Sequence, residues 1–184
     1  TRRPQADDAA HMAVTIGNYD QRMLSFDMTG GLTDALSFRV TGEVERSGTF
    51  VDFQDMNRVN GAISLRYAAS DRVVANLVAE YVERDTRRNP GLPVPGTVTS
   101  NGVRALDRNL YLGEPAIDSL FSHAPLVQAW VDVALSDNWT VTPRFQFSEF
   151  NTRFYQIRLR APQANLTTIN RNGRQGHEND AYYI

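Results

Sequence analysis

Hydrophobic and polar residues alternate one by one over many short segments of the chain. In the segment SFRVTGEVER, Phe38 and Val40 fall on one side, whereas Arg39 and Glu43 fall on the other. Successive side chains of a β-strand point to opposite faces, so this period of two is typical of strands. Eight Pro and twelve Gly leave few windows in which an amphipathic helix could form. The pattern therefore predicts an all-β fold.

Seven segments carry the alternation, and an eighth begins near His177. They are rich in Val, Phe, Ile and Tyr, which pack well in strands. One of them contains Pro143, a residue that cannot donate a hydrogen bond to the neighbouring strand and normally marks an edge or a bulge. The seven segments cover about 11–17, 21–29, 37–46, 58–69, 71–83, 125–135 and 139–147.

The connections between these segments alternate in length. GGLTDAL, AASDR and SDN are short and rich in turn-forming residues. The other connections grow from GNYD at Gly17 to two long stretches at about 85–122 and 151–176. Antiparallel strands joined in this way place short turns at one end and long loops at the other, as in outer-membrane barrels. We therefore expect an antiparallel transmembrane β-barrel.

Aromatic residues lie near the ends of several expected strands. Tyr19, Tyr67, Tyr81 and Trp139 hold such positions, where an amphipathic ring would meet the membrane interface. Aromatic residues also favour strands in general. Their placement alone leaves both interpretations open.

Composition and motifs narrow the classes of function. The 184 residues carry a formal net charge of −2, which is too small to favour a nucleic acid partner. All nineteen cationic residues are Arg, a bias that coding preference or anion recognition would explain. The absence of Cys excludes thiolate nucleophiles and Cys-ligated zinc. The three His lack metal-ligand spacing, and no catalytic motif is present, so we expect neither an enzyme nor a resident metal.

Four ordered motifs identify a family resemblance. TRRPQA opens the chain, GNYDQRMLSFDMTGGLTDALSFRV follows from Gly17, and GLPVPG and RNLYLGEP lie at Gly91–Gly96 and Arg108–Pro115. Together they resemble TonB-dependent outer-membrane siderophore receptors of the ferrichrome type. TRRPQA is similar to the segment that ends the plug domain of these receptors, and the second run is similar to their first barrel hairpins. The last two motifs resemble those of the third outer loop.

The resemblance implies a fragment of a larger protein. Such receptors have an N-terminal plug within a barrel of about 22 strands, of which this chain would supply about seven or eight. Residues 1–9 would be the end of the plug domain, and residues 10–184 the N-terminal part of the barrel. The protein would lie in the outer membrane of a Gram-negative bacterium, among lipid and lipopolysaccharide. TonB would act through a segment upstream of this chain.

The implied function is TonB-dependent import of a ferric siderophore, with iron carried in the ligand and no separate cofactor. Sites for compact organic ligands combine aromatic rings with a few polar groups. In the third outer loop, Arg88, Asn89, Leu92 and Tyr111 are the expected ligand-binding residues. Tyr111 could instead fold the loop onto the barrel rim. The polar sides of the strands would face the plug, through Arg39, Glu43, Arg66, Glu80 and Arg144.

Two other classes of protein fit part of the pattern. A small self-contained outer-membrane barrel with a structural or adhesive role fits the strand count. The plug-like start and the third-loop motifs count against it. A soluble β-sandwich that acts as a binding module would require the apolar faces of the strands to meet in a core.

Overall fold

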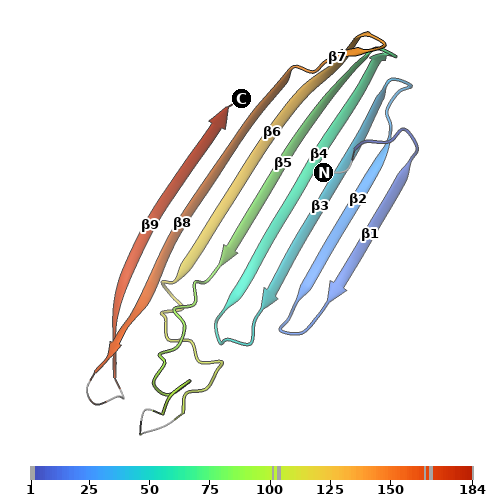
Figure 1. The fold of residues 1–184 in the computed structure, drawn as a ribbon. Coiled ribbons are helices and arrows are strands. Elements are labelled where there is room, and N and C mark those ends of the chain that lie inside the picture. Colours follow the sequence, from blue (N-terminus) through green and yellow to red (C-terminus); the bar gives the residue numbers. More distant parts are fainter. Residues whose placement is uncertain (1–2, 101, 103–104, 164, 166–167, 184) are drawn as a thin grey trace.

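A computed structural model shows one antiparallel sheet of nine strands in the part of the chain that it describes (Figure 1). The described residues are 3–100, 102, 105–163, 165 and 168–183. None of them belongs to a helix that is long and apolar enough to cross a membrane. The strands are β1 (Ala9–Ile16), β2 (Arg22–Gly31), β3 (Leu36–Gly48), β4 (Asp55–Ser70), β5 (Val73–Thr86), β6 (Ser119–Ser136), β7 (Trp139–Val141), β8 (Arg144–Pro162) and β9 (Ile169–Tyr183).

Strands that are consecutive in sequence are also neighbours in the sheet. The order is β1-β2-β3-β4-β5-β6-β8-β9, and the short β7 pairs with β6. β7 and β8 together correspond to one expected strand, which is broken at Thr142 and Pro143. Pro143 has no N–H to donate, although its carbonyl still accepts a hydrogen bond of 3.2 Å from the Val131 amide. The expected all-β antiparallel fold is confirmed.

Short turns lie at one end of the sheet and the longer connections lie at the other (Figure 1). The connection from β5 to β6 covers 87–118 and forms the largest loop. The prediction of a long loop at about 151–176 was wrong, because β8 continues to Pro162 and β9 begins at Ile169. Nearly all residues of β9 are exposed on both faces. Most residues of β9 are polar on both faces, so the strand shows no apolar alternation and the pattern did not reveal it.

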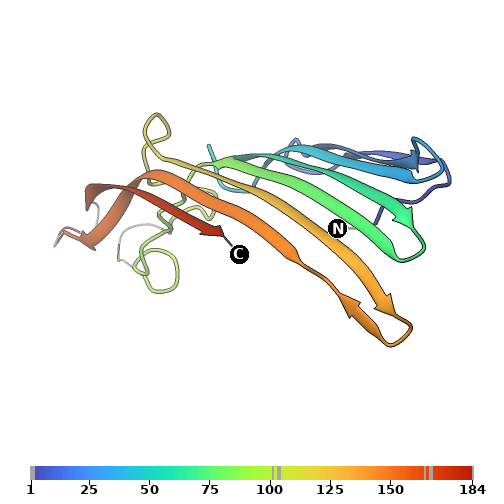
Figure 2. The ribbon, with the colours of Figure 1, turned by 90° about the horizontal axis from the view of Figure 1, so that it is seen from above.

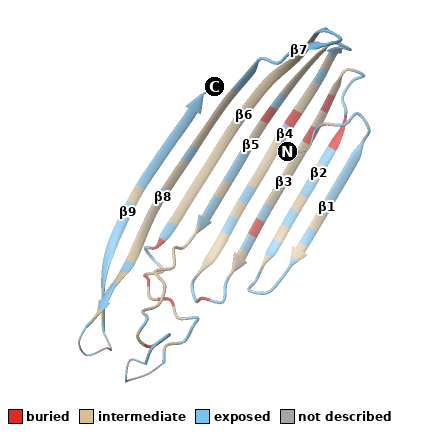
Figure 3. Cartoon of the chain, in the orientation of Figure 1, coloured by how far each residue is buried: buried red, intermediate tan, exposed pale blue. Residues whose placement is uncertain are grey.

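The two faces of the sheet are inverted relative to those of a soluble protein. On β4, Ile63 is 53% exposed, whereas the adjacent residue Ser64 is only 2% exposed. The buried residues that the structure describes, red in Figure 3, include more polar members than large apolar ones. Apolar side chains that point outward from a single layer suit a lipid surround, as in transmembrane barrels.

Strand register keeps each face continuous across the sheet. Val40 pairs with Ile63, which pairs with Ala79 and then Val127. We call this side the apolar face and the opposite side, which contains Arg39 and Ser64, the polar face. Seen from above, the sheet is a single curved layer (Figure 2). The apolar faces therefore do not meet in a core, as a β-sandwich would require.

Candidate ligand site

The loop 87–118 is fastened to the turn that joins β3 and β4. The Arg87 guanidinium donates to the Phe53 carbonyl at 3.1 Å and forms an ion pair with Asp55. The Asp52 amide donates to the Asn109 carbonyl at 2.8 Å, and the Asn109 side chain returns to the Asp52 carboxylate. The loop has little regular structure of its own. These links therefore fix its position at the end of the sheet.

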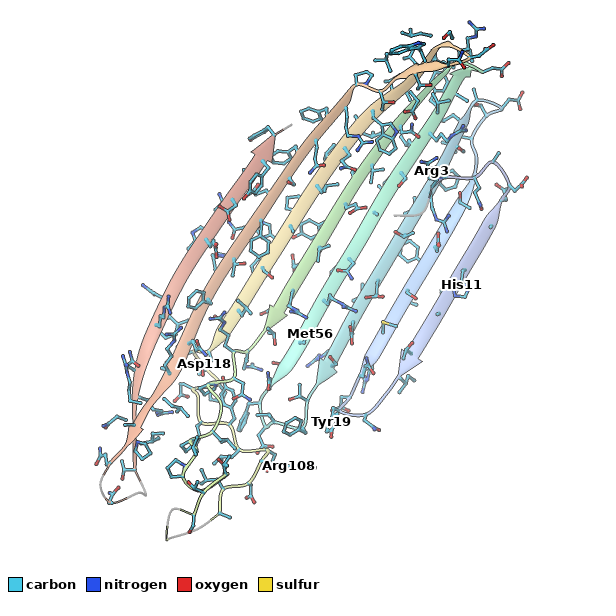
Figure 4. All side chains as sticks on the ribbon, in the orientation of Figure 1. Arg3, His11, Tyr19, Met56, Arg108 and Asp118 are labelled. Carbon is cyan, nitrogen blue, oxygen red and sulfur yellow. The ribbon has the colours of Figure 1, made fainter. Side chains whose placement is uncertain are left out.

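A buried tyrosine and a buried carboxylate close the base of the same loop. The Tyr111 hydroxyl donates to Asp118 at 2.7 Å, and its oxygen also lies 3.0 Å from the Arg88 carbonyl. The Asp118 carboxylate also accepts from the backbone amides of Glu114 and Ile157, so it ties the loop to β8. Figure 4 shows Asp118 where the loop rejoins the sheet. Burial, and then the hydrogen bond to Asp118, raises the pKa of Tyr111 well above its ordinary value.

An aromatic ring with two arginines lies beside the base of the loop. The guanidinium carbon of Arg88 is 4.5 Å from the centroid of the Phe154 ring, and that of Arg174 is 5.7 Å from it. These are cation–π distances. The Phe154 ring lies over Gly176, where an added Cβ would come within 2.6 Å of the ring. The cluster unites the loop, β8 and β9 on the polar face.

The expected ligand-binding residues occupy different environments. Tyr111 is buried, and its hydroxyl is engaged within the loop. Asn89 accepts a hydrogen bond from the Gly91 amide at 2.8 Å and donates to Gln54 at 3.3 Å, so it shapes the loop backbone. Leu92 is partly exposed in the same loop. Among the four, Arg88 has its cationic group beside the polar face.

The residues expected to face a plug do share the polar face. Arg39 pairs across strands with Ser64, and Glu80 with Ala62. Glu43 lies beside Arg58, whose guanidinium bridges Glu43 and Glu45 at 2.7 and 2.8 Å. The members of this set are Arg39, Glu43, Arg66, Glu80 and Arg144.

The N-terminal segment crosses this polar face. The Gln5 amide donates to the Thr29 hydroxyl at 2.9 Å, and Arg39 donates to the Arg3 carbonyl at 3.1 Å. Arg39 also holds Asp27 through two hydrogen bonds. Figure 4 shows Arg3 over the sheet rather than beyond its edge. The first two residues of the TRRPQA motif lie outside the described residues, and the remainder follows the polar face.

Sequence reasoning missed three residues of this region: Asp118, Phe154 and Arg174. Asp118 lies just beyond the RNLYLGEP motif, and nothing in its surroundings distinguishes it from an ordinary loop carboxylate. Phe154 and Arg174 fall within 151–176, which was expected to be a loop. Strand alternation from Phe145 onward would have placed Phe154 on the polar face, had the strand been extended. No group of three or more metal-ligating side chains occurs among the described residues.

Comparison with known proteins gives consistent results. No family model matches the chain. The ferrioxamine B receptor of Salmonella typhimurium strain SL1344 is 25% identical over 177 residues, which cover 93% of this chain and 25% of the receptor. The ferrioxamine receptor of Yersinia enterocolitica is 24% identical over 178 residues, which cover 93% of this chain and 24% of that receptor. The chain thus spans about a quarter of the length of these relatives.

Solved structures show the same fold at lower identity. The ferric-catecholate import receptor Fiu of E. coli K12, in its open form, superposes with a TM-score of 0.87 and 16% identity, covering all of this chain and 31% of Fiu. The ferripyoverdine receptor of the outer membrane of Pseudomonas aeruginosa gives a TM-score of 0.82 and 12% identity over 95% of this chain and 24% of that receptor. In sequence and in fold, the chain therefore matches a section of the barrel of outer-membrane siderophore receptors, the family that its motifs resemble.

Proposed function

We propose that the chain forms part of an outer-membrane receptor that imports a ferric siderophore in a TonB-dependent manner. The observation that carries this proposal is the inside-out sheet, with an apolar face outside and a polar face that holds the N-terminal segment. A channel wall needs a wet inner surface and a lipid-compatible outer one. The loop 87–118 at one end of that wall is fastened in place, as recognition loops on rigid scaffolds commonly are.

The N-terminal segment supports a division into plug and barrel. Residues 1–9 would end the plug domain, and residues 10–184 would form the N-terminal part of the barrel. The contacts from Arg3 and Gln5 to β2 and β3 are those expected of a chain that leaves a plug and enters the barrel wall. TonB would reach the receptor through a segment upstream of this chain. Lipid and lipopolysaccharide would surround the apolar face.

The names of the relatives leave the siderophore open. The sequence relatives are named for ferrioxamine, whereas the solved structures are named for ferric catecholates and ferripyoverdine. Arg88, Asn89 and Leu92 remain the proposed ligand-binding residues of the loop. For Tyr111 we propose a positioning role, because its hydroxyl is committed to Asp118. The polar-face set of Arg39, Glu43, Arg66, Glu80 and Arg144 would face the plug.

Growth under iron limitation tests the proposal. A strain that lacks its own siderophore receptors would express the receptor containing this chain, and it would be supplied with one ferric chelate at a time. We expect growth on one or a few chelates in cells with TonB and no growth in otherwise identical cells without it. Absence of growth on every chelate, in cells with TonB and in cells without it, would instead support the small structural or adhesive barrel.

A further inference from the structure

The cluster of Arg88, Phe154 and Arg174 carries information about the charge of the ligand. We define these three residues as the mouth cluster. Both guanidiniums lie within cation–π distance of a single ring on the polar face, although one belongs to the loop and the other to β9. Arg158 follows on the same face of β8, two register positions beyond Gln156 and Arg174. Positive charge is therefore gathered at the end of the sheet where the loop lies.

Neither arginine of the mouth cluster forms an ion pair with a carboxylate of the described residues. Arg87, which precedes Arg88, is neutralised by Asp55. The nearby carboxylate of Asp118 already accepts from Tyr111 and from two backbone amides. Glu178 lies on the same face but opposite Thr152, two register positions nearer the middle of the sheet than Phe154 and Gly176. The two cations thus face the space in front of the sheet without a carboxylate between them.

We infer, on the basis of the proposed function, that the ligand is an anionic ferric chelate of the tris-catecholate class. Each catecholate brings two negative charges to a trivalent iron, so such a complex is an anion, whereas a ferric tris-hydroxamate is neutral at the metal. Guanidiniums bind oxygen anions through strong charge-assisted hydrogen bonds. The Phe154 ring adds a flat apolar surface against which a catechol ring can pack. A neutral hydroxamate would gain little from either arginine.

Binding to the whole receptor, purified in detergent, tests this inference. The probes are a ferric tris-catecholate and ferrioxamine B, and the measurement is the quenching of intrinsic fluorescence. We expect Arg88→Gln and Arg174→Gln each to weaken binding of the tris-catecholate about tenfold or more, because each removes a charged donor. Arg174→Lys, which keeps the charge, should restore part of the affinity. Binding of the tris-catecholate to the unaltered receptor should also weaken as salt is added.

Arg153→Gln provides the matched control. Arg153 adjoins Phe154 on β8 but lies on the apolar face, where its guanidinium stacks 5.4 Å from Phe121. Its substitution should leave both affinities unchanged. Tighter binding of ferrioxamine B than of the tris-catecholate by the unaltered receptor would overturn the inference, as would equal losses for both probes in the two Gln variants. Binding of no ferric chelate at all would overturn the proposed function as well.

Discussion

The Tyr111 hydroxyl donates a hydrogen bond of 2.7 Å to the carboxylate of Asp118, a residue that is only 3% exposed. Tyr111→Phe keeps the ring and removes this donor, so the buried carboxylate loses one of its three hydrogen-bond donors. We expect the loop to be destabilised by about 1–3 kcal/mol. Limited proteolysis of the loop 87–118 in the folded receptor measures the change. Tyr67→Phe, on the apolar face of β4, is the control and should leave the cleavage rate unaltered.

The same pair predicts a dependence on alkaline pH. The pKa of Tyr111 in the folded protein is raised above the ordinary tyrosine value of 10.0, by burial and by the hydrogen bond to Asp118. Below pH 10 the Tyr111 phenol is protonated in both the folded and the unfolded loop, so its hydrogen bond to Asp118 contributes its full stabilisation. As the pH rises further, the unfolded segment loses its proton first, so the stability of the loop falls. Proteolysis should therefore accelerate above pH 10, and Tyr111→Phe should reduce that acceleration. An equal acceleration in both proteins would contradict the prediction.

Arg39 should control the attachment of the N-terminal segment. Its guanidinium is buried and binds both Asp27 and the Arg3 carbonyl. We expect Arg39→Gln to weaken this attachment by about 1–3 kcal/mol, since charged hydrogen bonds are lost. Hydrogen exchange at the Gln5 amide, which donates to Thr29, should accelerate. Arg66→Gln changes an arginine of the same face that pairs with Ser37 on β3; exchange at Gln5 should stay slow in that variant.

Charge on the apolar face should be far more harmful than charge on the polar face. Ile63 and Ala62 are adjacent on β4 and point to opposite faces. Ile63→Arg would place a cation in lipid, which costs about 2–4 kcal/mol near the bilayer midplane. Ala62→Arg would place the same cation in the wet interior. The fraction of receptor that shows heat-modifiable mobility on gels reports folding, and only Ile63→Arg should lower it. Similar losses in both variants would contradict the assignment of the faces.

The strands were predictable wherever lipid or the interior imposes alternation. Val40, Ile63 and Val127 each belong to a run in which every second residue is apolar, because one side of each strand must be apolar. The structure confirms that these residues share one face. On β8 the alternation continues beyond Asn151, with Tyr155, Ile157 and Leu159 on one side, so Phe154 could have been placed by extending that strand. Most of β9 is polar on both faces, and there the sequence does not distinguish strand from loop, so Arg174 was missed. Tyr111 was found by its motif, yet its partner Asp118 could be identified only from the folded loop.

Short turns and long connections lie at opposite ends of the sheet. We therefore expect the two ends to lie on opposite sides of the outer membrane. Val98, in the loop 87–118, is 82% exposed. A peptide tag inserted there should be reached by an antibody on intact cells. A tag inserted at Asp71, in the turn between β4 and β5 at the opposite end, should be reached only after the outer membrane is opened. Two insertions at opposite ends of the sheet, on different sides of the outer membrane, would thus map the orientation of the chain in living bacteria.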